Sequence, residues 1–459
     1  MKKTALLLAC ILALVSGRTQ TNNWYTQGDF TPAQRIQYTL INDLDMERTH
    51  CPVVIPRKGF PLPDIHEMWI TVVDPQLPPA GKPGDSLLKL QGGHQLREET
   101  NGHALFHQLD DLDKDGIWDE LYFITDLKPK EKKTIYLYFG ENIRGWNRHF
   151  THANIGSYVR HQMPFWESEE VGWKIWFANS VDVFAKRKPV LIAHRLYMEN
   201  IDGYGIGQLN EDYGSDIQSV AGSFGGGAIC LFEHPALPDS ISRPRFTPAH
   251  ARLAPKSFWN AGQISDTRYA YEVVVNGPLR SIIKIKTMNW KSGSGTYELE
   301  QYYTAYAHQS YTTCQVKYTR FAPAGKGVLM GAGIRKKPGA EDLFQQGGIV
   351  ISSGPEGIKD PEHIDDRMSL IVPFIGKAIV IKDQYKPRYQ YVPSFEGNHA
   401  LKVTAAPGNA YEYMLFAAWS EGPVLNTAEK FKAYVLKTAK EYNAPVRHDA
   451  GRIEDRKER

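Results

Sequence analysis

The chain has 459 residues, of which 54 are basic and 51 are acidic, so its charges nearly balance. This balance gives no sign of the basic surface by which proteins bind nucleic acid. Hydrophobic residues make up 42% and charged residues 23%, proportions typical of a folded chain, which exclude a disordered one. Because the chain is too long for one small core, we expect two or more domains.

The N-terminus has the layout of an export signal. Two lysines follow Met1, and the apolar stretch TALLLACILALVSG after them is too short for a comfortable membrane span. Ser16 and Gly17 offer a cleavage point, so we expect residues 1–17 to be a signal peptide and the mature protein to be periplasmic. Cys10 offers the alternative of a lipid attachment site, which would make the protein a membrane-attached lipoprotein.

The remaining cysteines and hydrophobic segments exclude two further classes. Cys51, Cys230 and Cys314 are widely spaced and odd in number, which is neither a disulfide framework nor a thiolate zinc site. No later segment is apolar enough to cross a bilayer, so we expect no integral membrane span.

Short apolar runs between turn residues predict strands along most of the chain. The first series, which includes MWITVVD, ELYFITDL and KTIYLYFG, predicts a small β-sandwich over residues 24–145. A region rich in Trp and His follows up to residue 200, and longer strands come after it, among them residues 271–290 and 295–308. Only one long segment shows a helical period, so we expect a mainly β fold.

That helix is expected over residues 426–442. Asn426 with Glu429 three residues later resembles a capping box, and Pro445 prevents the helix from continuing. One apolar stripe runs along it, made of Phe431, Val435, Ala439 and Tyr442. We expect the helix to pack on the last sheet and residues 446–459 to form a loose, charged tail.

An acidic stretch, LDDLDKDGIWDELYF at residues 109–123, interrupts the strands. Its first half matches the calcium loop of EF-hands, but the twelfth position is Tyr122 instead of Glu and the flanks are strands. It resembles the compact calcium hairpins of β-proteins, whose ligands here would be Asp111, Asp113, Asp115, the carbonyl of Ile117 and Asp119. The alternative is an acidic turn in which Asp and Gly serve backbone geometry alone. Either role is structural, because a saturated carboxylate site offers no base of useful pKa.

The same hairpin is the first of several stretches that resemble a family of domains of unknown function encoded in polysaccharide-utilisation gene clusters. The other stretches are FWESEEVGWKIWF, DYGSDIQSVAGSFGGGAI, VVVNGPLRSIIKI and FAAWSEG. The resemblance implies a galactose-mutarotase-like β-supersandwich, here over residues 146–445, after the small β-domain. It also implies carbohydrate chemistry, since the family includes a dehydratase that removes water from a terminal uronic acid of ulvan-type oligosaccharides.

From this resemblance we expect a carbon–oxygen lyase that forms a 4,5-unsaturated uronic acid at the non-reducing end of acidic, ulvan-like oligosaccharides. Such an elimination needs a cation to neutralise the carboxylate, a base for the C5 proton and an acid for the departing C4 oxygen, and it needs no cofactor. Two alternatives are a non-catalytic glycan-binding protein and a glycoside hydrolase with two carboxylates among Glu167, Asp212 and Asp216.

Residues 152–216 concentrate the side chains that this chemistry needs. Tyr213 would serve as acid or base, with His161 or His194 as its partner, while Arg195 would hold the carboxylate. His152 is a further candidate base. Each also has a structural alternative, because Tyr is common on sheets and a histidine in a β-protein is more often a satisfied structural residue.

Four further residues are candidates for substrate binding. Trp166 and Glu167 would stack on and hydrogen-bond a sugar, unless they are a core Trp beside a solvent-facing Glu. Asp216 and Arg280 would add polar contacts, although Arg280 follows NGP at a strand start and is equally placed to pair between strands. The glycine run at residues 222–229 lacks the ending of a phosphate loop, so we expect it to permit a tight strand crossing or close sugar approach.

Overall fold

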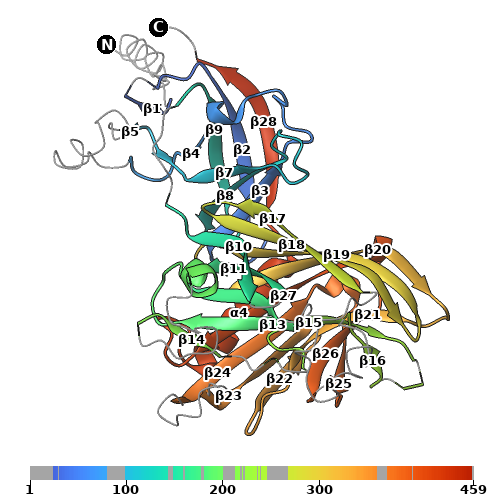
Figure 1. The fold of residues 1–459 in the computed structure, drawn as a ribbon. Helices are drawn as coiled ribbons and strands as arrows, with labels where there is room; N and C mark the ends of the chain where they lie inside the picture. The colour runs from blue at the N-terminus through green and yellow to red at the C-terminus, as the bar shows by residue number, and fades with distance from the viewer. Residues whose placement is uncertain are drawn as a thin grey trace, which may run out of the picture.

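The protein consists of a small β-sandwich stacked on a larger β-domain (Figure 1). The signal peptide and Cys10 lie outside the described residues, so their expected roles stay predictions. In the described part of the chain, no helix has the length and apolar character needed to cross a membrane. The computed structural model describes residues 24–28, 30–79, 99–142, 148–158, 161–176, 180–199, 212–217, 220, 223–234, 236–237, 239–244, 267–358, 370–394 and 396–456.

The small domain is a sandwich of a five-stranded sheet and a three-stranded sheet. The first has the order β28 (Arg447–Asp455), β2 (Gln34–Ile41), β9 (Lys132–Phe139), β4 (Ile70–Asp74), β6 (His103–Ala104). The second has the order β3 (Arg48–Pro56), β8 (Glu120–Leu127), β7 (His107–Asp110). Alternate residues of β2 and β9 are buried between the sheets, as period-two strands with one core face require. The short pair β1 (Thr26–Gln27) and β5 (Glu99–Thr100) and the 3-10 helix η1 (Glu67–Trp69) complete this domain.

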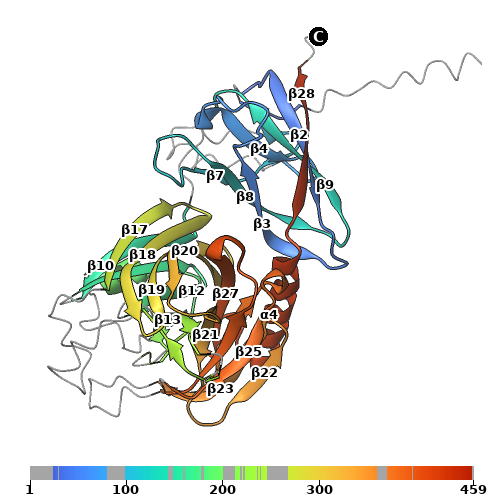
Figure 2. The same ribbon diagram turned by 90° about the vertical axis from the view of Figure 1, so that its right-hand side faces the viewer.

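The C-terminal tail is ordered, contrary to the expectation of a loose segment. Residues of β28 pair antiparallel with β2, so the last strand of the chain closes the edge of the first sheet (Figure 2). Arg447 adds a bidentate ion pair with Asp43, with N–O distances of 2.7 and 2.9 Å. The sequence did not predict β28 as a strand because its residues are highly charged. An edge strand exposes most of its side chains, so charged residues are compatible with it.

The large domain has an eight-stranded sheet facing two five-stranded sheets. The eight-stranded order is β17 (Arg268–Asn276), β18 (Arg280–Ser292), β19 (Gly295–Tyr306), β20 (Tyr311–Pro323), β27 (Ala410–Trp419), β24 (Leu370–Ile381), β23 (Ile349–Ile358), β22 (Asp342–Gln346). One five-stranded sheet has the order β10 (Thr151–Tyr158), β11 (His161–Ser168), β12 (Val171–Trp176), β13 (Ser180–Lys186), β14 (Gly214–Asp216). The other has the order β16 (Ile241–Ser242), β15 (Ala228–Phe232), β21 (Leu329–Arg335), β26 (Asn398–Val403), β25 (Arg388–Val392). Short helical turns in the described part of this domain are the π-helix η2 (Arg195–Glu199) and the 3-10 helices η4 (Asp383–Tyr385) and η5 (Pro407–Asn409).

One large hydrophobic core fills the space between these layers. Its members come from both five-stranded sheets and from the inner face of the eight-stranded sheet, and the mainly β, sandwich-like fold is thereby confirmed. The glycine run crosses this core tightly, because a Cβ at Gly227 would collide with Leu415 and one at Gly225 with the carbonyl of Val181. Of the two expectations for this run, the structure shows the tight strand crossing.

Helix α4 (Ala428–Asn443) covers the outer face of the eight-stranded sheet, as the sequence predicts (Figure 2). Phe431 is fully buried, and Gly376 on β24 makes room for its ring, since a Cβ there would lie 2.5 Å from the ring. The cap is one residue later than expected: the Thr427 hydroxyl, not Asn426, accepts the N–H of Lys430 at 3.3 Å.

The acidic turn joins β7 to β8 in the small domain. The carboxylate oxygens of Asp111, Asp113 and Asp115 lie within 4.8 Å of one another, so three of the five predicted ligands converge. Asp119 is outside that group, and its Oδ2 accepts the N–H of Leu112 at 2.7 Å. The same carboxylates also accept backbone N–H groups of the turn, including that of Gly116, so the alternative of an acidic turn fits as well.

Arg280 joins the two domains. Its Nε lies 2.5 Å from Asp110 Oδ2 and its Nη2 lies 2.6 Å from Glu120 Oε2, across the boundary between β18 and the small sandwich. Burial by itself lowers the pKa of Arg280, but the two carboxylates outweigh it and raise that pKa above its usual value. This overturns the expected substrate contact, because the guanidinium is buried and committed to two carboxylates.

We propose that the acidic turn binds calcium and predict that chelation lowers the melting temperature of the protein. An ion that binds only the native state stabilises that state. Adding Ca²⁺ to the metal-free protein should therefore raise its melting temperature by at least about 2 °C. Asp113→Asn keeps the turn's size and removes one charge, so it should abolish the response, whereas Asp45→Asn, on an exposed loop, should keep it. Equal midpoints with Ca²⁺ and with chelator would leave the acidic turn as the correct interpretation.

Arg280→Ala should destabilise the protein strongly. It leaves the buried Asp110 carboxylate without its partner, which costs about 3–5 kcal/mol in the free energy of unfolding. Denaturant unfolding measures this loss, and Arg268→Ala, at an exposed position of β17, is the matched control with little change. Full stability of Arg280→Ala together with lost substrate binding would restore the substrate role.

Candidate active site

The candidate site lies on the outer face of the sheet β10–β14, away from the large core. Adjacent residues of β11 point to opposite faces: Trp166 belongs to the core, while Phe165 belongs to a separate cluster outside the sheet. The strand register places His152 opposite Glu167 and Lys174 opposite Asp182. The outer face therefore carries charged residues where the inner face carries apolar ones.

Trp166 and Glu167 do not have the sugar contacts expected of them. The Trp166 indole is fully buried, stacks on Tyr303 at a centroid distance of 4.5 Å and donates to the Thr312 hydroxyl at 2.8 Å. The Glu167 side chain has no exposure either. Neither side chain reaches a surface on which a sugar would lie.

Glu167 is the buried anion at the centre of the outer face. Its Oε2 accepts the Lys186 ammonium and the Ile192 N–H, and its Oε1 accepts the Ala193 N–H at 2.9 Å. Burial by itself raises the pKa of Glu167, but the Lys186 charge, the neighbouring His152 and the hydrogen bonds from Lys186 and Ile192 outweigh burial and lower that pKa. Gly172 on β12 lies between Glu167 on β11 and the strand β13 that carries Lys186, and a Cβ there would stand 3.9 Å from Lys186 Cε, so the Lys186 chain crosses β12 at this glycine.

Two histidines face this carboxylate. His152 Nδ1 lies 3.7 Å from Glu167 Oε1, and the His152 ring meets the His194 ring edge-on at a centroid distance of 5.6 Å. The His152 side chain is 17% exposed, so the cluster borders solvent. Of the two predicted partner histidines, the structure brings His194 to the site, while the side chain of His161 lies outside the described residues.

A second buried ion network lies beside the first. Lys174 Nζ lies 2.9 Å from Asp182 Oδ2 and 2.8 Å from Asp216 Oδ2, tying β12, β13 and β14 together. Burial lowers the pKa of Lys174, but the two carboxylates outweigh it and raise that pKa well above the usual value. Burial and the Asp216 charge raise the pKa of Asp182 well above its usual range. Asp216, expected to bind substrate, is thus held by a buried lysine.

Tyr213 and Arg195 form the open rim of the site. Arg195 Nη1 donates to the Tyr213 hydroxyl at 3.1 Å, which joins the two residues that the sequence assigns to proton transfer and carboxylate binding. The Arg195 side chain is 40% exposed and lies 3.7 Å from Glu199. Lys188 Nζ lies 4.9 Å from the centre of the Tyr213 ring, so the rim is positively charged.

Sequence reasoning missed the buried lysines Lys174 and Lys186 and the acid Asp182. A signal for them exists in WKIWF and VDVFAK, where single charged residues interrupt apolar strands. A charge in such a strand is buried or faces a ligand, and either position needs a partner. What the sequence cannot supply is which distant strand carries that partner.

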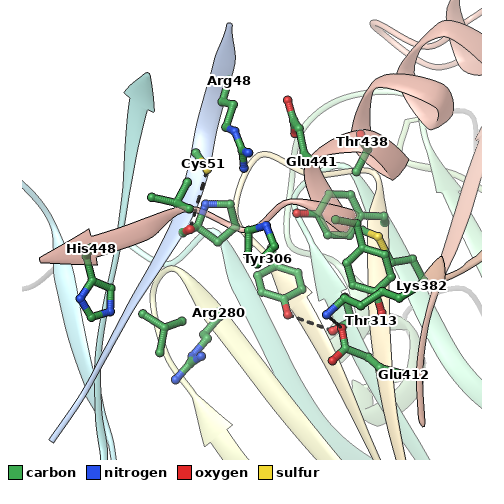
Figure 3. A pocket seen from close by; sticks show the side chains of 17 residues that line it. Arg48, Cys51, Arg280, Tyr306, Thr313, Lys382, Glu412, Thr438, Glu441 and His448 are labelled. Carbon is green, nitrogen blue, oxygen red and sulfur yellow. Dashed lines mark hydrogen bonds and ion pairs between the residues drawn. The ribbon is translucent and has the colours of Figure 1, made fainter. Parts of the chain in front are cut away.

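A cavity of about 320 Å³ lies elsewhere, at the junction of the two domains (Figure 3). Residues of β3, β20, β27 and α4 line it, and Arg280 is the member of the predicted site set found there. Two pairs of its polar groups bond to each other: Lys382 to Glu412 at 3.1 Å and Tyr306 to Thr313 at 2.9 Å. Its lining includes one histidine, His448, and no other histidine of the described residues.

Comparisons with known proteins describe distant likenesses. No curated protein matches the sequence. A glycosyl hydrolase family 38 protein from Enterococcus faecalis has 10% identity and a TM-score of 0.45 over 91% of this chain and 47% of its own. An alpha-mannosidase from Enterococcus faecalis V583 has 11% identity and a TM-score of 0.43 over 92% of this chain and 46% of its own. The chain therefore spans about half the length of these solved structures.

A family model covers far more of the sequence than any single motif. It is described as a domain of unknown function, DUF4861, and matches residues 87–447. This range includes the acidic turn, the residues around Glu167 on the outer face and helix α4. Since this range is well over half of the chain, the protein belongs to the DUF4861 family.

Proposed function

We propose that this protein is a dehydratase of the carbon–oxygen lyase class that forms a 4,5-unsaturated uronic acid at the non-reducing end of acidic, ulvan-like oligosaccharides. The observation that carries the proposal is the Arg195–Tyr213 hydrogen bond at a partly exposed rim, where Lys188 places a second cation beside the Tyr213 ring. The resemblance of the sequence to a family encoded in polysaccharide-utilisation gene clusters supports the carbohydrate substrate. An exported, periplasmic protein fits that role, with a lipid anchor on Cys10 as the alternative.

Arg195 would neutralise the uronate carboxylate. A guanidinium has five donors in a planar fork, so it has donors left for a carboxylate while one of them holds the Tyr213 oxygen. Neutralising the carboxylate lets negative charge build up at the adjacent C5 as its proton leaves. Lys188, next to the Tyr213 ring, adds a second positive charge to the same rim.

Tyr213 would move a proton, with His194 as its partner. The C5 proton passes to the base, the C5–H electron pair becomes the C4–C5 double bond, and the C4–O bond breaks. The acid protonates the departing oxygen, so water leaves and the atoms balance. A guanidinium that donates to the phenol oxygen stabilises the negative charge that develops there when the phenol gives up its proton.

A hydrolase that uses Glu167 and Asp216 is disfavoured by their surroundings. Two-carboxylate hydrolysis needs an acid and a base that flank the scissile bond. Here Glu167 has no exposed surface and holds Lys186, while Asp216 holds Lys174. Both carboxylates are therefore engaged by buried lysines on the sheet and neither is free to flank a sugar.

Tyr213→Phe should abolish turnover and leave the fold intact, because it removes one hydroxyl and little volume. Loss of a general acid or base should raise the activation free energy by on the order of 3 kcal/mol or more. Short-ultraviolet absorbance measures turnover, since a conjugated unsaturated uronate absorbs there and hydrolysis products do not. A panel of uronate oligosaccharides identifies the substrate.

The matched control is Tyr391→Phe, which makes the same change at an exposed tyrosine on β25 and should keep full turnover. Near wild-type activity of Tyr213→Phe would show that this residue assignment is wrong. Binding of the oligosaccharides without any rise in absorbance would favour the non-catalytic glycan-binding alternative.

A further inference from the structure

Three metal-ligating side chains converge on the outer face of the sheet. His152 from β10, Glu167 from β11 and His194 from the turn before η2 each offer a ligand atom, and these atoms all lie within 4.8 Å of one another. The three come from separate segments of the chain, so local sequence spacing does not explain their convergence. We propose that His152, Glu167 and His194 bind a divalent transition metal ion of the zinc type.

The donor set favours this class of ion. Two imidazole nitrogens and one carboxylate oxygen suit zinc, whereas calcium and magnesium prefer shells of oxygen. Ligands about 2.0–2.2 Å from a tetrahedral zinc stand about 3.3 Å apart, so small side-chain rotations close the present spacing. Three protein ligands leave a fourth position, and the partial exposure of His152 opens that position to solvent.

The hydrogen bonds around Glu167 leave a place for the ion. Oε2 accepts Lys186 and Ile192, and Oε1 accepts Ala193, so one lone pair on Oε1 remains. His152 Nδ1 is buried and makes no hydrogen bond in the described part of the chain. Its 3.7 Å separation from Oε1 is too long for a hydrogen bond. An ion between these two atoms would satisfy both.

Lys186 and the backbone provide the support that such a site needs. Metal-binding carboxylates are themselves held by hydrogen bonds, which fix their orientation. Lys186 also donates to the carbonyls of Ser168 and Val190 at 2.6 and 2.7 Å, so its ammonium is anchored independently of Glu167. The carboxylate therefore keeps one face for Lys186 and turns the other toward the two histidines.

The competing interpretation is a metal-free ion pair between protonated His152 and Glu167. In that arrangement the wild type would bind no Zn²⁺ tightly, and His194 would have no special part. The two interpretations therefore differ in zinc binding by the wild type and in its loss from His194→Ala. The proposed metal site does not depend on the proposed dehydratase, because its binding is measured without substrate. With an ion bound, His194 would be a metal ligand, and Tyr213 would serve both as the base for the C5 proton and as the acid for the departing oxygen.

The experiment is a titration of the full metal-free chain with Zn²⁺. Binding is measured by calorimetry and by competition with a chromophoric chelator. Excess Ca²⁺ is present throughout to occupy the acidic turn. We expect one tight Zn²⁺ per chain, and His194→Ala should weaken its binding at least about 100-fold. His152→Asn tests the second ligand, and His234→Ala, at an exposed histidine, is the matched control that should bind as wild type.

The visible absorption of bound Co²⁺ distinguishes a metal ligand from a residue that is needed only for the fold. Co²⁺ in a four-coordinate site with nitrogen ligands absorbs in the visible, and this absorption should be present in the wild type and lost in His194→Ala. Circular dichroism of the metal-free variants confirms that they fold. Absence of tight Zn²⁺ binding to wild type, or wild-type affinity in His194→Ala, would overturn the proposal whatever the enzymatic activity proves to be.

Discussion

The arrangement of the outer face depends on one constraint, that the buried Glu167 carboxylate must be neutralised. An unpaired charge in such a place is too costly to keep, so the fold brings Lys186 across Gly172 and two backbone N–H groups to it. These N–H groups belong to Ile192 and Ala193, which immediately precede His194 and Arg195. The anchoring of one carboxylate thereby fixes where both candidate functional residues emerge.

The second ion network uses the same principle to fix the other side of the rim. Lys174 lies between Asp182 and Asp216 and so joins β12, β13 and β14. Asp216 is on β14, three residues after Tyr213, so this ion network also fixes the segment that carries Tyr213. Apolar residues in these positions would pack at least as well, because buried ion pairs contribute little net stability. Retaining charges on this face is therefore better explained by function than by folding, and perturbed carboxyls such as Asp182 concentrate at functional sites.

Local patterns in the sequence predict the strands and the helix, but not which strands pair or which side chains meet. Helix α4 follows from its apolar stripe, whereas β28 has an exposed, charged pattern and becomes a strand only because the edge of β2 is open to it. The dipeptide of Trp166 and Glu167 shows the same limit at the site. Period two puts the two residues on opposite faces, but only the other strands decide which face is core and which partner Glu167 meets.

The charges at the rim of the outer face determine which kind of ligand fits there. The Lys186 ammonium offsets the charge of Glu167, and the Lys174 ammonium lies between the carboxylates of Asp182 and Asp216. The buried cations are therefore engaged by buried carboxylates. The rim keeps the positive charges of Arg195 and Lys188 beside Tyr213, and the exposed carboxylate of Glu199 lies 3.7 Å from Arg195. An exposed pair of that length is weak, so an anionic ligand can displace Glu199 from Arg195, as the carboxylate of the proposed uronate substrate would.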